Sequence, residues 1–412
     1  MQEVSSKYAV GIDIGTTTVR CVVGHIDGAT GVPTIVGVGT APNSGMRKGN
    51  VVMLNGPAAA MDDALGEAER MSGYQVDTAT ISINGSHILS THADGMIAVG
   101  GANHEITEED ILRIEEVATL GKIPANREVL EVVPHSYKLD GQDNIKNPVG
   151  MTGTRLEIDA HVMSVLTPNL VNLQKSAESA KVLPSSIVIA GVAAARAVLG
   201  EHQIENGVAL VDIGGATTNV AVYEEGDLRF TAVIPMGGIN ITNDLAIGLK
   251  VDQEVAEKLK IEHASAMSSN GNSGVSLEYD GQIYSFSTSD IDEIVEARLE
   301  EIFEAVNREL GRIGRAGKLP NGVVLTGGTA QLKGLADYAK EALGLAAKVG
   351  SAAGYGGVAD DIDKPQFATA VGLMLIDSEN ETHVSKNHKA NAKNVISGGY
   401  GVISKLLGRF RP

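Results

Sequence analysis

Two strand-like runs of this sequence each end in an aspartate that is followed by a turn rich in glycine and threonine. Residues 8–13 lead into the Gly-Thr-Thr-Thr turn 15–18, and residues 208–212 lead into the Gly-Gly-Ala-Thr turn 214–217. After each turn come two more strand-like runs joined by a hairpin, which predicts a β-meander. Helical patterns follow both meanders. The chain is therefore predicted to contain two α/β halves built on a duplicated unit.

Both turns carry the groups that bind phosphate. Backbone N–H groups can approach a phosphate closely where glycine removes the side chain, and threonine hydroxyls add further donors. A carboxylate beside each turn can hold Mg²⁺ directly or through water. Asp13 and Asp212 are these candidates. One such turn alone also occurs in unrelated β-proteins, so it is the duplication that favours a two-sided phosphate clamp.

A third glycine-rich turn follows the apolar run 323–325 and reads Thr-Gly-Gly-Thr-Ala over 326–330. A helical pattern begins after it, near Leu332. Backbone at a strand-to-helix junction can pack against a flat ring and offer N–H groups to a ligand. This turn therefore suits an adenosine.

Helical spacing of apolar residues predicts helices over 57–71 in the first half and over 239–249 and 253–262 in the second. Residues 291–310 form a longer pattern with its apolar positions on one face, which is typical of a helix packed on a core. At 412 residues the chain is too long for one hydrophobic core and is expected to form two or three domains.

A compact stretch between residues 86 and 164 interrupts the first half. It combines a predicted helix over 107–120 with strand-like runs over 129–137 and 155–166. We expect it to form an inserted subdomain.

The last part of the chain changes character. From residue 377 to 394 the sequence is polar without apolar periodicity, which predicts a flexible linker. The segment 395–412 then combines apolar residues at three- to four-residue spacing with cations, which predicts an amphipathic helix on a membrane. Its apolar residues are Val402, Ile403, Leu406, Leu407 and Phe410, and its cations are Lys405, Arg409 and Arg411. The pattern alone also fits docking on the chain's own surface or on another copy.

Charge and cysteine content limit the function classes. With 51 acidic and 33 basic residues the net charge is −18, which argues against nucleic acid as a partner. The single cysteine, Cys21, lies in an apolar run, is expected to be a core thiol and fits a reducing cytoplasm. No apolar stretch of signal-peptide length stands in residues 1–7, and no run of about 18 apolar residues occurs anywhere, so neither a cleaved signal nor a membrane span is expected.

The three turns, in this order, resemble the phosphate-1, phosphate-2 and adenosine motifs of the actin/Hsp70/sugar-kinase superfamily. The resemblance implies an α/β, actin-like (ribonuclease H-like) duplicated fold, in which 187–199 and 367–375 connect the halves at a hinge. Read without it, both segments are helices rich in small residues. Within the superfamily the chain resembles the FtsA family over essentially its whole length. The segments that carry this are 11–17, 45–49, 134–137, 147–156, 211–222, 237–246 and the amphipathic tail.

What the resemblance implies is ATP binding with Mg²⁺, self-assembly into a filament, and binding of the C-terminal tail of the tubulin homologue FtsZ and of other divisome proteins. It also implies peripheral attachment to inner-membrane lipids, on the cytoplasmic face at the division septum. The implied cofactor contacts are Asp13, Gly15, Thr16, Thr17, Asp212, Gly214, Gly215, Thr217, Glu257, Lys260, Gly327, Gly328 and Thr329, with Asp13 and Asp212 as the metal ligands. Glu257 and Lys260 also fit a solvated helical charge pair.

Subdomain boundaries follow from the same resemblance. They are 1–85 with 165–195 and 364–377 for subdomain 1A, 86–164 for the FtsA-specific insertion 1C, 196–250 with 311–363 for 2A, 251–310 for 2B, 378–394 for the linker and 395–412 for the amphipathic helix. The FtsZ tail is expected to bind 2B near 291–310, where Arg298 matches a family position. A free arginine there could pair with an acidic residue of the peptide. Arg298 could equally be a structural surface residue.

Two departures from the family pattern predict at most a weak ATPase. Ala216 and Asn219 stand where relatives often have glycine and aspartate. Residues 190–192 read Ala-Gly-Val where hydrolysing relatives place a glutamate that orients water. Because positioning of the attacking water is a main contribution of the protein to phosphoryl transfer, nucleotide binding should outlast hydrolysis.

Other classes fit less well. A sugar kinase needs a general base for the acceptor hydroxyl, and no aspartate beyond the two metal candidates offers itself. An Hsp70-type chaperone needs a peptide-binding domain, for which too few residues follow 367–375. Zinc-ligand spacing and the P-loop sequence do not occur. The competing interpretation is a related actin-like scaffold of pilus assembly or cell shape.

Overall fold

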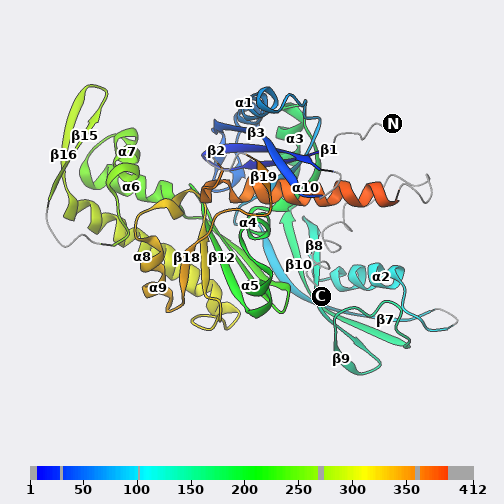
Figure 1. Cartoon of the computed structure of the whole chain (residues 1–412). Helices are drawn as coiled ribbons and strands as arrows, with labels where there is room; N and C mark the ends of the chain where they lie inside the picture. Colours follow the sequence, from blue (N-terminus) through cyan, green and yellow to red (C-terminus); the bar gives the residue numbers. More distant parts are fainter. Residues whose placement is uncertain (1–6, 28–30, 101–102, 268–272, 358–361, 388–412) are drawn as a thin grey trace.

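The computed structural model describes residues 7–27, 31–100, 103–267, 273–357 and 362–387. Two central sheets dominate it (Figure 1). The first has the order β11-β6-β1-β2-β3-β19 and the second the order β14-β13-β12-β17-β18. The strands of the first are β1 (Lys7–Ile14), β2 (Thr18–Ile26), β3 (Pro33–Pro42), β6 (Thr78–Ile83), β11 (Leu183–Ile189) and β19 (Gly356–Gly357). Those of the second are β12 (Val208–Ile213), β13 (Thr218–Glu224), β14 (Asp227–Ile234), β17 (Val323–Thr326) and β18 (Ala347–Val349).

The two sheets repeat one topology, so the predicted duplication is confirmed. β1 pairs antiparallel with β2, β2 antiparallel with β3, and β6 and β11 join parallel to β1. β12, β13, β14, β17 and β18 repeat this arrangement. β12 is buried at every position because its sheet is covered on both faces, which explains its continuous apolar run. Cys21 lies in the core on β2, as predicted.

Small residues set how the helices pack on the first sheet. α1 (Asn55–Ser72) lies against β3, where a side chain at Gly39 would overlap the backbone of Ala64. α10 (Ala368–Asn387) crosses the other face, where Gly11 meets Ala370. α4 (Ala190–Val198) and α10 touch through Gly372. The two segments predicted to connect the halves therefore lie side by side, although residues 187–189 belong to β11 and not to a helix.

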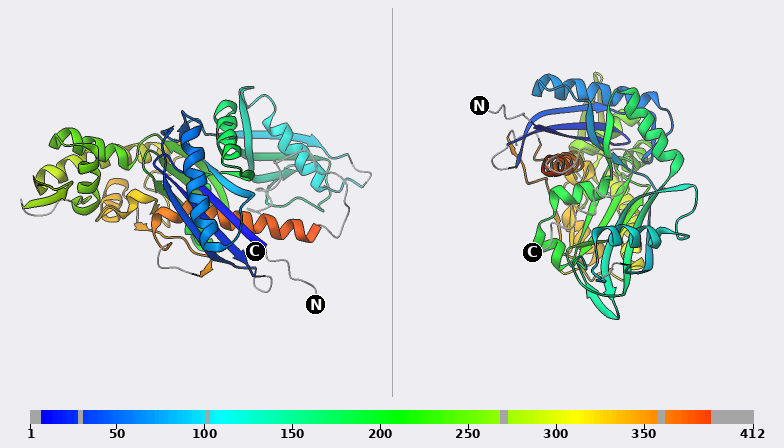
Figure 2. Two further views of the ribbon diagram at one scale, coloured as in Figure 1. Left: turned by 90° about the horizontal axis from the view of Figure 1, so that it is seen from above. Right: turned by 90° about the vertical axis from the view of Figure 1, so that its right-hand side faces the viewer.

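The stretch predicted as an insertion forms a sheet of its own with the order β7-β10-β8-β9. Its elements are β7 (Leu89–Ala98), α2 (Glu108–Thr119), β8 (Arg127–Leu139), β9 (Gln142–Ile145) and β10 (Arg155–Leu166). α2 starts at a capping box in which Thr107 Oγ1 accepts from the Asp110 N–H and Asp110 Oδ2 accepts from the Thr107 N–H. The insertion stands at one end of the molecule (Figures 1 and 2).

The other end is the outer part of the second half (Figure 1). It consists of α6 (Gly238–Leu249), α7 (Gln253–His263), the hairpin β15 (Gly274–Tyr279) and β16 (Gln282–Ser287), and α8 (Thr288–Arg312). α8 buries the apolar face that its spacing predicts. The remaining elements are β4 (Met46–Arg47), β5 (Asn50–Val51), α3 (Thr167–Ser179), α5 (Glu201–Asn206), α9 (Leu335–Leu343) and the 3₁₀ turns η1 (Gly328–Gln331) and η2 (Pro365–Phe367).

α10 extends further than predicted, to Asn387, so the first part of the predicted linker 378–394 is helical. Its buried face turns polar at Asp377, whose carboxylate accepts hydrogen bonds from the Val10 N–H (2.9 Å), Thr80 Oγ1 (2.8 Å) and Ser185 Oγ (2.8 Å). The apolar pattern in the sequence ends at Asp377, but Asp377 and Ser378 are still buried in the structure. The rest of the linker and the whole tail 395–412, with its predicted membrane residues, lie outside the described residues. Among the described helices, none is long and apolar enough to cross a membrane.

Candidate functional site

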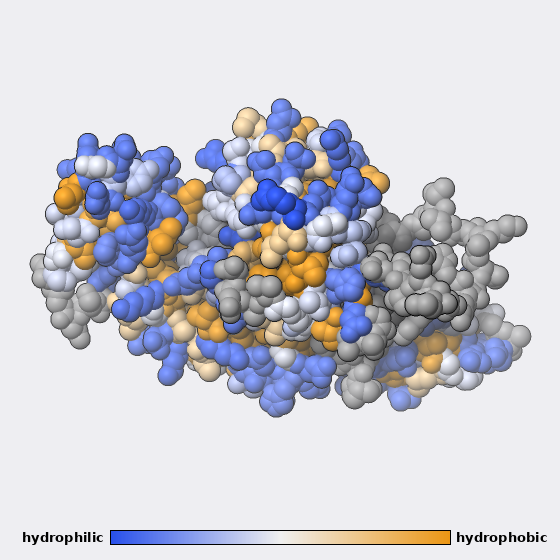
Figure 3. Space-filling view, turned by 45° about the horizontal axis from the view of Figure 1, so that its top comes forward, coloured by the Kyte–Doolittle hydropathy of each residue, from blue (hydrophilic) through white to orange (hydrophobic). Residues whose placement is uncertain are grey.

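A cleft of about 1160 Å³ lies between the two halves. A space-filling view shows a hollow between the outer part of the second half and the first half (Figure 3). The turns after β1, β12 and β17 all open into the cleft. Every residue predicted to contact the cofactor lines it: Asp13, Gly15, Thr16, Thr17, Asp212, Gly214, Gly215, Thr217, Glu257, Lys260, Gly327, Gly328 and Thr329. Residues from distant parts of the chain thus share one site.

The turn between β1 and β2 is held from outside the cleft by the loop that precedes α1. Asn43 Nδ2 donates to the Gly15 carbonyl at 2.7 Å, and the Gly49 N–H donates to Thr16 Oγ1 at 2.9 Å. Because Thr16 Oγ1 accepts this bond, its own proton stays available to an acceptor. These bonds fix the turn, and the Thr16 hydroxyl remains able to donate a hydrogen bond to a ligand in the cleft.

The turn between β12 and β13 meets the first turn directly. A side chain at Gly215 would approach Thr17 Oγ1 to 2.6 Å, so glycine is what lets the turns come together. Asn84 Nδ2 from the end of β6 donates to Thr217 Oγ1 at 3.0 Å, which joins the two halves. The α6 N-terminus is fixed to the same turn, because the Gly238 N–H donates to the Gly214 carbonyl at 2.9 Å.

Two carboxylates mark the floor of the cleft, the buried Asp212 and the half-buried Asp13. Burial, and then the charge of Asp13, raises the pKa of Asp212 to about 7, against a 3.0 Å hydrogen bond from Asn219 and the charge of Arg20. Burial also raises the pKa of Asp13, which Arg20 and a 2.9 Å hydrogen bond from Ser82 oppose. Like charges this close are unfavourable without cations, and Arg20 supplies one positive charge near both carboxylates. The pair therefore fits a divalent metal ion, with oxygen ligands of the kind that Mg²⁺ prefers.

The third turn completes the floor. Gly327 has a φ of +88°, and a side chain there would overlap Asp212 and approach the Ile213 carbonyl to 2.6 Å. Thr329 Oγ1 donates to the Gly214 carbonyl at 3.0 Å. Gly328 is different, because no atom of the described residues, its two chain neighbours aside, lies within 4 Å of the position its side chain would take. It leaves open space on the cleft side.

Glu257 and Lys260 are more than a solvated pair on α7. Lys260 Nζ lies 2.6 Å from Glu257 and donates to Thr242 Oγ1 at 2.9 Å and to the Gly238 carbonyl at 3.2 Å. The lysine side chain is only 14% exposed. These contacts tie α7 to the start of α6, beside the turn after β12.

Sequence reasoning missed Arg20 and Asn84. Arg20 is the lone charge in the apolar strand β2, yet it lines the cleft, lies over the Phe367 ring and interacts with both aspartates. A charged side chain in a buried strand is rare without a partner, so its position was a usable signal. Asn84 carried no such signal.

Arg298 lies on α8, and the structure does not place it among the cleft-lining residues. Its guanidinium makes two hydrogen bonds to Asp244, at 2.6 and 3.1 Å, and one to Glu301 at 2.6 Å. The hydrogen bond to Asp244 raises the pKa of Arg298. The expectation of a free arginine is therefore wrong, because carboxylates of this chain already occupy it.

Comparison with known proteins decides the family. The family model for the cell division protein FtsA matches residues 209–372, and that for the SHS2 domain inserted in FtsA matches residues 85–164. The cell division protein FtsA of Pseudomonas aeruginosa is 35% identical over 375 residues, covering 90% of this chain and 89% of the relative. The chain belongs to the FtsA family. This membership makes it a cell division protein, and the SHS2 match coincides with the sheet of β7 to β10.

Solved structures share the fold of this FtsA-family chain. A chain of the PilM–PilN type IV pilus biogenesis complex superimposes with a TM-score of 0.65 at 16% identity, covering 90% of this chain and 98% of the other. MreB5 of Spiroplasma citri bound to ADP does so with a TM-score of 0.53 at 14% identity, covering 93% and 99%. The predicted actin-like fold is confirmed. Identities this low support a shared fold only. They do not favour the alternative functions in pilus assembly or cell shape.

Proposed function

We propose that this chain binds ATP with Mg²⁺ in the cleft, polymerises and tethers the FtsZ ring to the cytoplasmic membrane during division. One observation carries the proposal: all residues predicted to contact nucleotide line one cleft, with the carboxylates of Asp13 and Asp212 at its floor. Membership of the FtsA family supports the role in division. The likeness to MreB5, solved with ADP, supports a nucleotide as the ligand.

The protein groups fit magnesium nucleotide. The turns after β1 and β12 offer backbone N–H groups and threonine hydroxyls to phosphates, and the open space at Gly328 leaves room for a flat ring. Asp13 and Asp212 would hold Mg²⁺, directly or through water. Bound there, Mg²⁺ would supply positive charge that offsets the charges of the carboxylates and the phosphates. Glu257 and Lys260 would contact the adenosine.

Hydrolysis should be slow because the cleft offers little to orient a water molecule. Ala190, at the start of α4, lines the cleft with a methyl group. The Asn219 side chain donates to Asp212 instead of adding a carboxylate. The cleft therefore serves binding better than turnover.

Attachment depends on two other regions. The FtsZ tail would bind the outer part of the second half near α8, where an acidic peptide would have to compete with Asp244 and Glu301 for Arg298. Residues 395–412 would bind lipid at the cytoplasmic face of the septum. One tail should bind weakly, and a polymer that presents many tails should bind firmly.

The test is sedimentation with anionic vesicles, with and without MgATP and a peptide of the FtsZ C-terminal tail. Full-length protein should sediment with vesicles and bring the peptide down. Deletion of 395–412, and Leu406→Glu separately, should leave the protein in the supernatant. Retained sedimentation of both variants would exclude the tail as the anchor, and undiminished peptide binding by Arg298→Ala would exclude that residue as the contact.

A further inference from the structure

The insertion makes a specific polar contact with the second half. Lys146, which follows β9, places its Nζ 2.6 Å from Asp227 Oδ2 at the start of β14. The same ammonium donates to the His135 carbonyl at 3.1 Å and to the Glu225 carbonyl at 3.5 Å. The Asp227 side chain is only 6% exposed. A buried carboxylate of one half thus depends on a cation of the insertion.

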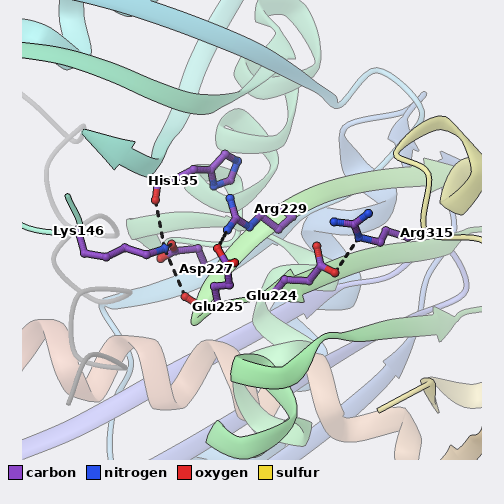
Figure 4. Close-up of polar contacts among 7 residues, drawn as sticks. All are labelled: His135, Lys146, Glu224, Glu225, Asp227, Arg229 and Arg315. Atoms are coloured by element: carbon purple, nitrogen blue, oxygen red, sulfur yellow. Dashed lines mark hydrogen bonds and ion pairs between the residues drawn. The ribbon is translucent and has the colours of Figure 1, made fainter. Parts of the chain in front are cut away.

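The hairpin that carries Asp227 is fixed on its other side by its own half. Arg315 Nε lies 2.7 Å from Glu224, and Arg229 pairs with Glu225 within the hairpin. Figure 4 shows Lys146 and Arg315 approaching the hairpin from opposite sides. The β13–β14 hairpin is therefore held between the insertion and the rest of the second half.

His135 lies at the same junction on β8. Burial lowers its pKa, and the nearby charge of Arg229 lowers it further. The imidazole therefore stays neutral between Lys146 and Arg229. Protonation would put a third positive charge beside Lys146 and Arg229. Because the ring is neutral, it does not repel Lys146 from its position next to Asp227.

The same hairpin reaches the cleft at its other end. β13 begins at Thr218, directly after Thr217 of the cleft turn, and ends at Glu224. β14 runs back from Asp227 to Ile234, and the chain then returns to that turn, where the Gly238 N–H donates to Gly214. Seven residues of strand span about 20 Å. Paired along their length, β13 and β14 form a stiff connection from cleft to insertion.

Covalent connections place the insertion on the first half, because β6 leads into it and β10 continues directly into α3. We propose that Lys146 and Asp227 latch the insertion to the second half, so that nucleotide in the cleft controls the position of the insertion relative to the first half. A change in the angle between the halves must either move the insertion or break the pair. The inference rests on the proposed nucleotide binding.

The test uses the full-length chain and two readouts: MgATP affinity by calorimetry, and amide hydrogen exchange of β8 and β9 with and without MgATP. In the wild type, MgATP should change exchange in this segment about fivefold or more. Lys146→Ala should abolish this response and change MgATP affinity by a similar factor, because coupling between two sites is reciprocal. Lys138→Ala is the matched control, since it breaks an exposed 3.2 Å pair with Asp143 inside the insertion.

Each outcome decides a different claim. If Lys146→Ala behaves like Lys138→Ala, the latch is wrong while nucleotide binding stands. If the wild type binds no MgATP, the proposed nucleotide function fails first. Should Lys146→Ala unfold because Asp227 is left unpaired, Lys146→Met with Asp227→Asn removes both charges. This double variant must also lose the effect of MgATP on hydrogen exchange of β8 and β9. If it keeps that effect, the proposal is overturned.

Discussion

Gly327 and Gly328 are neighbours in the chain but stand in different environments. A side chain at Gly327 would require a left-handed backbone and overlap Asp212, whereas at Gly328 it would enter open space. We predict that Gly327→Ala lowers the free energy of unfolding by about 1–3 kcal/mol and that Gly328→Ala leaves it unchanged. Chemical denaturation without ligand checks this.

Larger residues at 328, such as Gly328→Val, should weaken MgATP binding without loss of stability, and unchanged affinity would remove Gly328 from the site.

Glu131 gives the fold a pH dependence. Burial, and then the charge of Glu115, raises its pKa from 4.5 to about 8. Between these values the folded protein holds a proton on Glu131 that the unfolded chain releases, so Glu131 alone should lower stability as pH rises from about 5 to 8, by at most about 1.4 kcal/mol per pH unit. Glu131→Gln should flatten this slope in urea titrations, while Glu128→Gln on the same strand should keep it. Equal slopes in wild type and Glu131→Gln would contradict the assignment.

Turnover tests the interpretation of Ala190 and Asn219. Since Ala190 lines the cleft with a methyl group and Asn219 is hydrogen-bonded to Asp212, steady ATP hydrolysis should stay below about 1 per second. Phosphate release by purified protein, with and without vesicles, measures it. Sustained faster hydrolysis in either condition would mean that another group orients the water.

At the scale of elements, periodicity predicted α1, α6, α7 and α8 because each buries an apolar face of its own. It failed at α10, where hydrogen bonds to Asp377 replace apolar burial. It also failed at residues 187–189, because a short apolar run before Ala190 fits strand and helix equally well.

The role of Asp377 can be measured. Asp377→Ala should cost about 2–5 kcal/mol of unfolding free energy, because the Val10 N–H and two hydroxyls would lose their acceptor in the core. Asp143→Ala is the control, since that carboxylate is 72% exposed and forms a surface pair worth little. Similar melting of both variants would show that the end of α10 contributes little to the fold.

At the scale of the whole molecule, the two repeated Gly/Thr turns predicted the duplicated halves and the site between them. Each motif is local in sequence, so the two α/β halves and the three glycine-rich turns could be inferred from patterns, while the actin-like fold and the full set of cleft residues came from the family resemblance. The contacts that join the halves could not be, because Asn84 and Thr217 are 133 positions apart, and Lys146 meets Asp227 only once the insertion has folded back. The pairing of Arg298 with Asp244 could not be inferred for the same reason, since Asp244 approaches it from another helix.

The central claim is that magnesium nucleotide binds between Asp13 and Asp212, and calorimetric titration of MgATP into wild type and Asp13→Ala tests it most directly. Removal of Asp13 also relieves repulsion on Asp212, so the variant is expected to stay folded, which its melting curve checks. The account predicts saturable binding to wild type and to Asp143→Ala, and at least about tenfold weaker binding to Asp13→Ala, a difference of about 1.4 kcal/mol. Equal affinity of wild type and folded Asp13→Ala would contradict it.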